Sequence, residues 1–221
     1  MNIDGVADAE DVRQLTGWAQ EGKAKGWWAD YTDLLQPPSC QYLGLEAAAA
    51  TLRSYCPVLM PDLLQTKDYA AAAVRAIRPG IRPESAGRLA AATMRRQDIM
   101  RDGGTLHAII DEAALRTAVG SAQVMAEQVR HLALSADQPG VTVQVLAMAT
   151  PRPVICPPFT VLSFRADPDL AFTGIVGGQV TLSKPAGTAA ACDAFARIAK
   201  AALSAAESAR LLASIPDPVQ E

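Results

Sequence analysis

Two adjacent carboxylates, Asp111-Glu112, follow a segment of alternating apolar residues and are the first candidates for chemistry in this sequence. A pair of acids poised at a pocket could transfer protons to and from a bound molecule. The same residues stand where a helix or turn begins, and such a position favours a carboxylate cap. Two interpretations of Asp111 and Glu112 therefore stay open: they form a structural cap, or they are a catalytic pair if the protein is an enzyme.

The tryptophans form a second candidate. Trp18, Trp27 and Trp28 lie with Tyr31 in the first 31 residues of a chain that is only 5% aromatic. Indole rings offer a large contact area with few torsions to freeze, so they could stack on a flat ligand or on a partner's helix. The alternative is a staple that fastens an N-terminal helix to the body of the protein.

Arginines concentrate in segment 75–101, which carries seven of them against two acids. Guanidinium groups such as those of Arg95, Arg96 and Arg101 hold carboxylates through forked hydrogen bonds, so the segment could meet an acidic partner. A solvated helix face is the alternative.

Metal and nucleotide chemistry find no support in the motifs. The four cysteines are far apart in the sequence, and we expect them to be free thiols. Neither His107 nor His131 has a second metal ligand at a suitable spacing, so we expect ordinary structural roles for both. The sequence contains no phosphate-binding loop and no G-x-S-x-G element, and the glycines at 174–178 lack dinucleotide-loop spacing. We expect no metal and no cofactor.

Composition bounds the class of protein. The chain has 221 residues, 50% of them hydrophobic, and a formal net charge of −3, so it should fold and should not wrap nucleic acid. Its apolar runs fall short of the ~20 residues that a bilayer span needs. The first residues have neither a basic region nor an apolar stretch, so we expect a cytoplasmic protein without a secretory signal.

Periodicity and caps predict the elements that position these residues. A turn is expected at 37–39, a strap or hinge at 26–31 and a long ordered loop at 151–158. Predicted helices cover 7–25, 43–56, 66–77, 83–101, 121–136, 189–202 and 204–215, and predicted strands cover 105–110, 141–146, 159–164, 170–176 and 179–182.

The order of these segments predicts the fold class. The segments at 105–110, 121–136 and 141–146 form a β-α-β unit, and the three later strands suit a meander of tight turns. The expected class is α+β, with an N-terminal helical segment, a small mixed or antiparallel sheet in the middle and two C-terminal helices.

Many ordered motifs over roughly residues 20–215 resemble one family. They are G-W-W with Tyr31, Y-L-G-L-E-A from Tyr42, Y-C-P-V-L-M-P-D-L-L-Q-T-K-D-Y-A from Tyr55, Arg95-Arg96-Gln97, I-I-D-E-A-A-L-R from Ile109, V-T-V-Q-V-L from Val141 and Pro158-Phe159-Thr160. This pattern resembles the C-terminal domain of actinobacterial XRE-type, antitoxin-like transcriptional regulators, the WhiJ-like group.

The resemblance implies a layout. Such regulators usually carry a helix-turn-helix reader of DNA ahead of this region, joined to it at the G-W-W element, and here about 25 residues precede that element. We therefore expect no direct DNA binding. The expected domains are an N-terminal helix and Trp-rich strap at 1–31, a ligand- or partner-binding α+β domain at 32–215 and a tail at 216–221.

The sequence also departs from the family pattern. Asp62 stands where a glycine is usual, the late strand around 172–174 lacks an acid that is common there, and the loop at 150–158 is atypical. The differences at the late strand and at that loop suggest a pocket altered for a different ligand or for its turnover.

Two functions follow. One is a regulatory module that binds a small effector, a small protein partner or a full-length regulator, without contact to nucleic acid or membrane. The other is a cofactor-free enzyme, of cyclase or isomerase type, from bacterial secondary metabolism, with Asp111 and Glu112 as its candidate catalytic residues. The expected ligand- or partner-binding residues are Trp27, Trp28, Tyr31, Gln65, Tyr69, Arg95 and Arg96.

Overall fold

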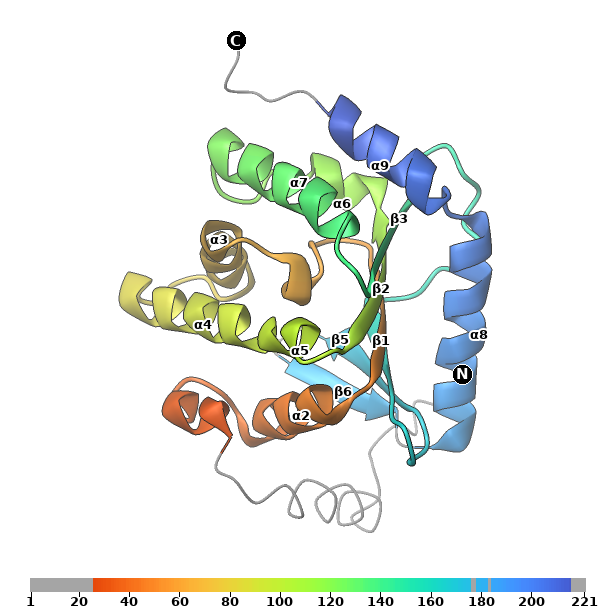
Figure 1. The fold of residues 1–221 in the computed structure, drawn as a ribbon. Helices are drawn as coiled ribbons and strands as arrows, with labels where there is room; N and C mark the ends of the chain where they lie inside the picture. The colour runs from red at the N-terminus through yellow and green to blue at the C-terminus, as the bar shows by residue number, and fades with distance from the viewer. Residues whose placement is uncertain (1–25, 176–177, 183, 216–221) are drawn as a thin grey trace.

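The computed structural model describes residues 26–175, 178–182 and 184–215. Its centre is a six-stranded sheet in the order β3-β2-β1-β4-β5-β6 (Figure 1). The strands are β1 (Thr51–Cys56), β2 (Thr105–Asp111), β3 (Val141–Leu146), β4 (Phe159–Ser163), β5 (Leu170–Ile175) and β6 (Gly178–Leu182). The predicted helix at 7–25 and the predicted tail at 216–221 lie outside the described residues.

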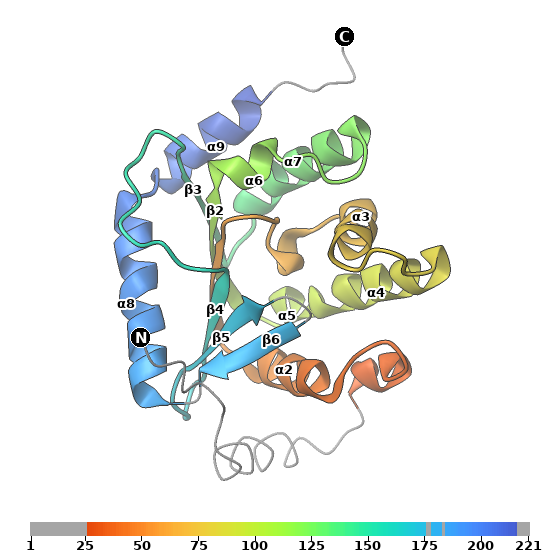
Figure 2. The ribbon, with the colours of Figure 1, turned by 180° about the vertical axis from the view of Figure 1, so that it is seen from behind.

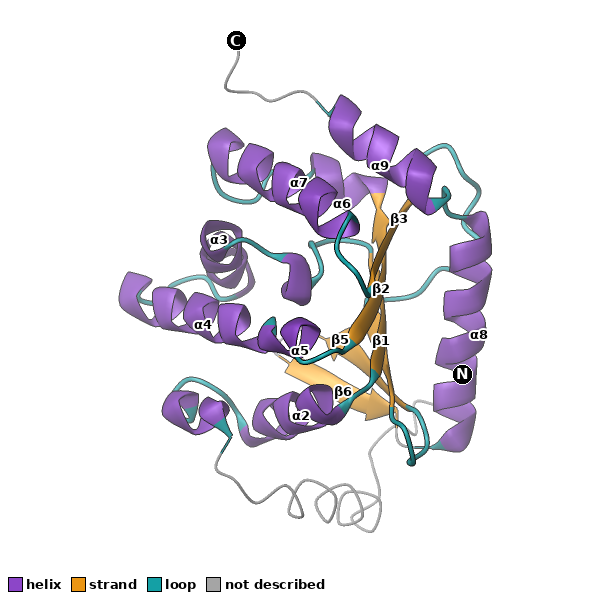
Figure 3. Ribbon diagram, in the orientation of Figure 1, coloured by secondary structure: helices purple, strands orange, loops and turns teal. Residues whose placement is uncertain are grey.

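Helices cover both faces of this sheet, as Figure 3 shows in the same view. The longer ones are α2 (Pro37–Ala48), α3 (Lys67–Ile77), α4 (Pro83–Arg96), α7 (Ala122–Ala136), α8 (Pro185–Ala201) and α9 (Ala205–Ser214). Short ones are η1 (Trp27–Tyr31), η2 (Asp62–Leu64), α5 (Asp98–Arg101) and α6 (Glu112–Arg116). Helices α2, α3, α4 and α7 lie on one side of the sheet and α8 on the other (Figures 1 and 2).

The sheet is mixed, and its two halves differ in direction. Strands β1, β2 and β3 are parallel neighbours, joined by helices on one face of the sheet. The chain then returns to the other side of β1, where β4 pairs antiparallel with β1 and continues into the antiparallel strands β5 and β6. The predicted α+β class, β-α-β unit, meander and two C-terminal helices are thereby confirmed.

Local sequence explains most helix starts. Thr66 and Ser121 accept hydrogen bonds from the backbone N–H of Tyr69 and Val124, and Ser204 forms a capping box with Glu207. Pro83 occupies the first turn of α4, where a missing N–H costs nothing. The helix predicted at 83–101 is interrupted at Gln97, so α4 and α5 are separate.

One predicted helix was wrong. Residues 43–56 form the end of α2 and then β1, because the chain is extended at Ala49 and pairs from Thr51 onward with strands on both sides. The alanine run favoured a helix, but the burial of Leu52 and Tyr55 in a central strand outweighs that weak propensity. The turn predicted at 37–39 was also wrong, since these residues are the first turn of α2.

Two apolar cores lie on the two faces of the sheet. Leu52 of β1 belongs to the core under α2, α3 and α7, whereas Tyr55 belongs to the core under α8. Alternation along β1 also places Ser54 and Cys56 on the same face as Leu52. Ser54 and Cys56, near the carboxyl end of β1, therefore lie on the face of the sheet that α2 and α4 cover.

Candidate functional site

A hollow of about 200 Å³ lies beside the carboxyl end of β1. This is where the direction of the sheet changes, between β1 and β4, and open α/β sheets bind ligands at such switch points. Its apolar walls are Leu52, Met60, Leu63, Leu106, Phe159 and Phe172, and its neutral polar groups include Ser54, Cys56 and Thr160. The Ser54 and Thr160 hydroxyls lie 3.1 Å apart and hydrogen-bond to each other.

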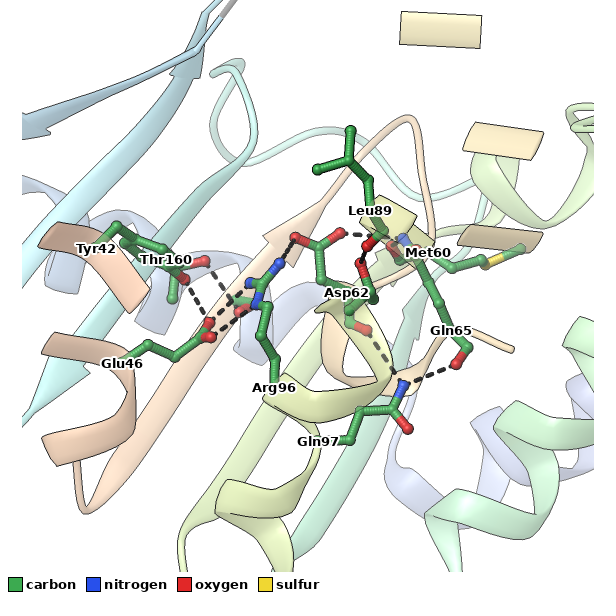
Figure 4. Close-up of polar contacts among 11 residues, drawn as sticks. Tyr42, Glu46, Met60, Asp62, Gln65, Leu89, Arg96, Gln97 and Thr160 are labelled. Atoms are coloured by element: carbon green, nitrogen blue, oxygen red, sulfur yellow. Dashed lines mark hydrogen bonds and ion pairs between the residues drawn. The ribbon is translucent and has the colours of Figure 1, made fainter. Parts of the chain in front are cut away.

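An ion cluster closes one side of this hollow (Figure 4). Arg96 Nε and Nη2 donate to the two carboxylate oxygens of Glu46, each at 2.8 Å, and Nη1 donates to Asp62 Oδ2 at 2.8 Å. Tyr42 Oη donates to Glu46 Oε1 at 2.8 Å, and the Arg96 guanidinium lies over the Tyr42 ring at 5.7 Å. Helices α2 and α4 and the turn η2 each supply part of the cluster.

Burial and nearby charge shift the pKa values of Tyr42, Arg96 and Cys56 upward. Burial raises the pKa of the Tyr42 phenol well above its usual range, and Glu46 raises it further. Burial alone would lower the pKa of Arg96, but the carboxylates of Glu46 and Asp62 outweigh it and hold that pKa well above the usual range. Burial also raises the pKa of the Cys56 thiol strongly, with Asp62 adding to the effect. The hollow therefore presents a neutral phenol and a neutral thiol beside a charged guanidinium.

A second hollow, of about 220 Å³, lies between α2, α3, α4 and η2. It is lined by apolar residues of these helices together with Ser39, Gln65, Arg78 and Thr93. Four residues line both hollows: Tyr42, Leu59, Asp62 and Arg96. The ion cluster is thus part of the wall between them.

Gln65 and Tyr69, predicted to contact a ligand, hold the loop that follows β1. Gln65 Nε2 donates to the Met60 carbonyl at 2.8 Å and to Asp62 Oδ1 at 3.1 Å. Tyr69 Oη accepts from the Met60 N–H at 3.2 Å, and Gln97 Nε2 donates to the Gln65 carbonyl at 2.8 Å. These buried bonds fix the position of Asp62, and Gln65 also lines the second hollow.

Asp111 and Glu112 hold a different part of the chain. Asp111 Oδ1 accepts from the Ala113 N–H at 3.0 Å and from Arg152 Nη2 at 2.9 Å, which confirms the capping alternative. Glu112 accepts from the Met148 N–H at 2.8 Å and forms an ion pair with Arg116. The residues that line the two hollows include neither acid.

The Trp-rich segment packs onto the helices of the domain. Trp27 and Trp28 are half-buried against the core and meet edge to face, with ring centroids 5.9 Å apart. Arg95 lies 5.2 Å over the Trp27 ring and pairs with Asp30 at 3.3 Å. Tyr31 lies under Arg88 at 5.9 Å. Helix α4 thus holds this segment through Arg88 and Arg95, which lie two turns apart on one face of the helix.

The arginine-rich segment uses several of its charges inside the chain. Arg96 binds Glu46 and Asp62, Arg88 binds Asp33, and Arg101 binds Asp98 within α5. Arg78 donates to the Leu34 carbonyl at 3.2 Å. The expected forked bond is present at Arg96, which holds Glu46 through two hydrogen bonds, whereas Arg95 and Arg101 each donate one bond to a carboxylate. All of these acceptors belong to this same chain.

A wider groove of about 630 Å³ runs between α7 and α9. Its walls are mostly small apolar side chains, and one of its charged residues, Arg116, is engaged by Glu112. Ligand sites combine apolar walls with converging polar groups, a combination that the hollow at β1 has.

The binding residues predicted from the sequence did not include Glu46, Asp62 and Tyr42. Tyr42 and Glu46 are four residues apart on α2, so they share a helix face, and a glutamate among alanines could have indicated a buried partner. Their link to Arg96 depends on how α2 and α4 pack, which spacing does not indicate.

Apart from Cys56, no cysteine or histidine is among the residues that line the two hollows. The four cysteines are free thiols. His107 Nε2 lies 2.7 Å from Gln144 Oε1, and burial lowers the pKa of His131. Among the described residues, no group of three or more metal-ligating side chains is gathered closely enough to hold an ion.

The fold and the hollow define a mixed α+β domain with a buried ion cluster at its sheet switch point. Residues 39–214 match the family described as Domain of unknown function (DUF5753), and the chain belongs to this family. No curated protein and no solved structure matches the chain significantly. In the part of the chain that the structure describes, every helix is too short or too polar to traverse a bilayer.

Proposed function

We propose that this domain is the effector-binding part of an antitoxin-like transcriptional regulator of the WhiJ-like group, and that its effector is a small molecule. The motif resemblance across most of the chain supports the regulator class. The hollow at the carboxyl end of β1 supports the small-molecule effector, and it is the observation on which the proposal rests.

Size and lining fit a small ligand. An apolar cavity of roughly 150 Å³ is enough to hold a benzene ring, and this hollow has about 200 Å³ with the rings of Tyr42, Phe159 and Phe172 in its walls. A ring would lose its apolar hydration there, which contributes about 25 cal/mol per Å² of buried area. The ion cluster at one side supplies the polar contacts that give orientation.

The state of the polar groups favours binding over reaction. The phenol of Tyr42 and the thiol of Cys56 are kept neutral by burial, so neither is an activated nucleophile or base. Asp111 and Glu112, the acids predicted for an enzyme, are bound to Arg152, Arg116 and backbone N–H groups. These contacts suit a sensor, whose polar groups bind without turnover.

The experiment compares two threonine substitutions, each introduced into the gene in the bacterium that encodes this protein. Thr160→Phe places a ring in the hollow at β1, whereas Thr142→Phe makes the same change at an exposed position of β3. We expect the Thr160→Phe strain to show either the transcript changes of a strain that lacks the gene or the transcript profile that bound effector produces. We expect the Thr142→Phe strain to match the wild type.

Both variants are first checked for folding by circular dichroism and thermal melting. If the folded Thr160→Phe variant leaves the transcript profile identical to that of the wild type, the regulatory sensor is refuted.

A further inference from the structure

We propose that the two hollows are one ligand site, closed in the middle by the Asp62–Arg96 ion pair, and that its occupant is a small amphipathic carboxylic acid. The acid's carboxylate takes the place of Asp62 on Arg96 Nη1, and its apolar body extends into both hollows. This inference rests on the proposed function, because it names the class of effector that the sensor binds.

The first support is the shared wall. Tyr42, Leu59, Asp62 and Arg96 line both hollows, and Figure 4 shows the Arg96 guanidinium reaching toward Glu46 on one side and Asp62 on the other. Pockets for drug-sized ligands span roughly 300–1,000 Å³. Each hollow, at about 200 and 220 Å³, is smaller than this range, and the two joined fall within it.

The second support is the asymmetry around Arg96. Glu46, with a side chain only 4% exposed, binds the Nε and Nη2 edge through two bonds, and the Tyr42 ring lies under the guanidinium. The two bonds and the ring contact fix the plane of the guanidinium. Only the Nη1 bond runs to Asp62, so the guanidinium keeps its place when that bond is exchanged.

The third support is the position of Asp62. Its side chain is 48% exposed and it is the first residue of the short turn η2. Release breaks the bond from Arg96 Nη1 and the 3.1 Å bond from Gln65 Nε2, and the freed carboxylate returns to water. An incoming carboxylate restores the same bond and the same local charge, and its apolar body adds burial that Asp62 does not have.

The Nη1 donor argues for an acid over an amine. An ammonium group has no acceptor atom, so it cannot take the bond that Asp62 accepts from Arg96 Nη1, whereas a carboxylate can. Arg78 adds a further positive charge to the lining of the second hollow. A neutral ligand could fill one hollow but would have no means of displacing Asp62.

The experiment titrates the full chain with 4-phenylbutyrate, which has a ring, a chain and a carboxylate. The matched probes are 4-phenylbutyramide and 4-phenylbutylamine, and binding is read by calorimetry and by ¹³C-methyl NMR of Met60 in the first hollow and Ala73 in the second. We expect the acid to bind about tenfold more tightly than the amide, since a charge-assisted bond is stronger than a neutral one. Both methyl groups should shift.

Two aspartate variants test the displacement. Asp62→Asn removes the competing carboxylate, so the acid should bind about tenfold more tightly to it than to the wild type. Asp98→Asn makes the same change at an exposed aspartate paired with Arg101, and it should leave the affinity unchanged. The opposite sign for Asp62→Asn, with the amine as the best probe, would show that Asp62 itself binds a cation and would overturn the inference.

The remaining outcomes separate the inference from the proposed function. If the amide binds as well as the acid and shifts Met60 alone, the hollow is a ligand site but the acid class and the joined hollows are wrong. If none of the three probes shifts Met60 and Thr160→Phe changes no transcript, both the inference and the sensor are wrong.

Discussion

Two carboxylate–arginine clusters lie near the carboxyl ends of the parallel strands, and they differ in what surrounds them. The cluster of Asp111, Glu112 and Arg152 closes onto backbone: its acids cap α6 and hold the loop after β3. The cluster of Glu46, Asp62 and Arg96 stands between two hollows, and one of its acids is half-exposed. The first cluster stabilises the chain, and the second has a group that a ligand can reach.

The difference teaches that adjacency in sequence is a poor guide to a site. Asp111-Glu112 attracts attention because two acids stand side by side, yet neighbouring residues at a helix start are well placed to bind backbone. The members of the second cluster are 16 and 34 residues apart along the chain, counting from Glu46 to Asp62 and from Asp62 to Arg96. Only the packing of α2, η2 and α4 brings them together.

The largest expected effect is on the free energy of unfolding, because the two clusters differ in how deeply their ion pairs are buried. Arg96→Met leaves the buried Glu46 carboxylate without its partner, which should lower the free energy of unfolding by about 3–5 kcal/mol. Arg116→Met removes a 55% exposed partner from Glu112 and should cost less than about 1 kcal/mol. Urea unfolding of both variants measures the difference.

A double variant checks the cause. Glu46→Gln together with Arg96→Met removes both charges, so it should recover much of the stability that Arg96→Met loses. Equal losses in the single and the double variant would mean that packing, and not the stranded charge, explains the effect.

A smaller effect is expected from the cap in the first cluster. Asp111→Ala removes the bond to the Ala113 N–H and the partner of Arg152, and losing a helix cap costs about 1–2 kcal/mol. Hydrogen exchange at the amides of α6 should accelerate in the variant. Asp98→Ala, at an exposed aspartate, serves as the control. Equal exchange rates for the α6 amides in the two variants would show that Asp111 does not stabilise α6 as a cap.

The smallest effect concerns pH. The Met148 N–H and then Arg116 hold the pKa of Glu112 below its ordinary value, so its ionised form stabilises the fold at neutral pH. This stabilisation is present above the unfolded pKa and is lost as the pH falls through the lower folded pKa. We expect Glu112→Gln to lower the melting temperature at about pH 7, and we expect the difference from the wild type to shrink as the pH falls below the ordinary glutamate pKa of ~4.3. A constant difference between the two melting curves would show that ionisation does not matter.

The sequence predicted the parts of the fold that depend on local patterns. The alternating valines of Val141–Leu146, the cap at Thr66 and the capping box at Ser204 all act within a few residues, and each appears as predicted. Strand β1 was missed because its alanine-rich flank favours a helix and its pairing partners are 54 and more positions away. Strand formation there depends on long-range contacts.

The site was predicted only in part, for the same reason. Arg96, Gln65 and Tyr69 were singled out, but Glu46 and Asp62, which give Arg96 its role, were not. A buried glutamate and an exposed glutamate look alike in a sequence. Their difference arises from the packing of α2 against α4, which no short motif encodes.

The central claim is that the hollow at the carboxyl end of β1 holds a small molecule. Native mass spectrometry tests this claim most directly. The wild type, Thr160→Phe and Thr142→Phe are each incubated with an extract of the cells that encode this protein. The account predicts a bound small molecule on the wild type and on Thr142→Phe, and its absence from Thr160→Phe. The same bound mass on all three proteins would contradict it.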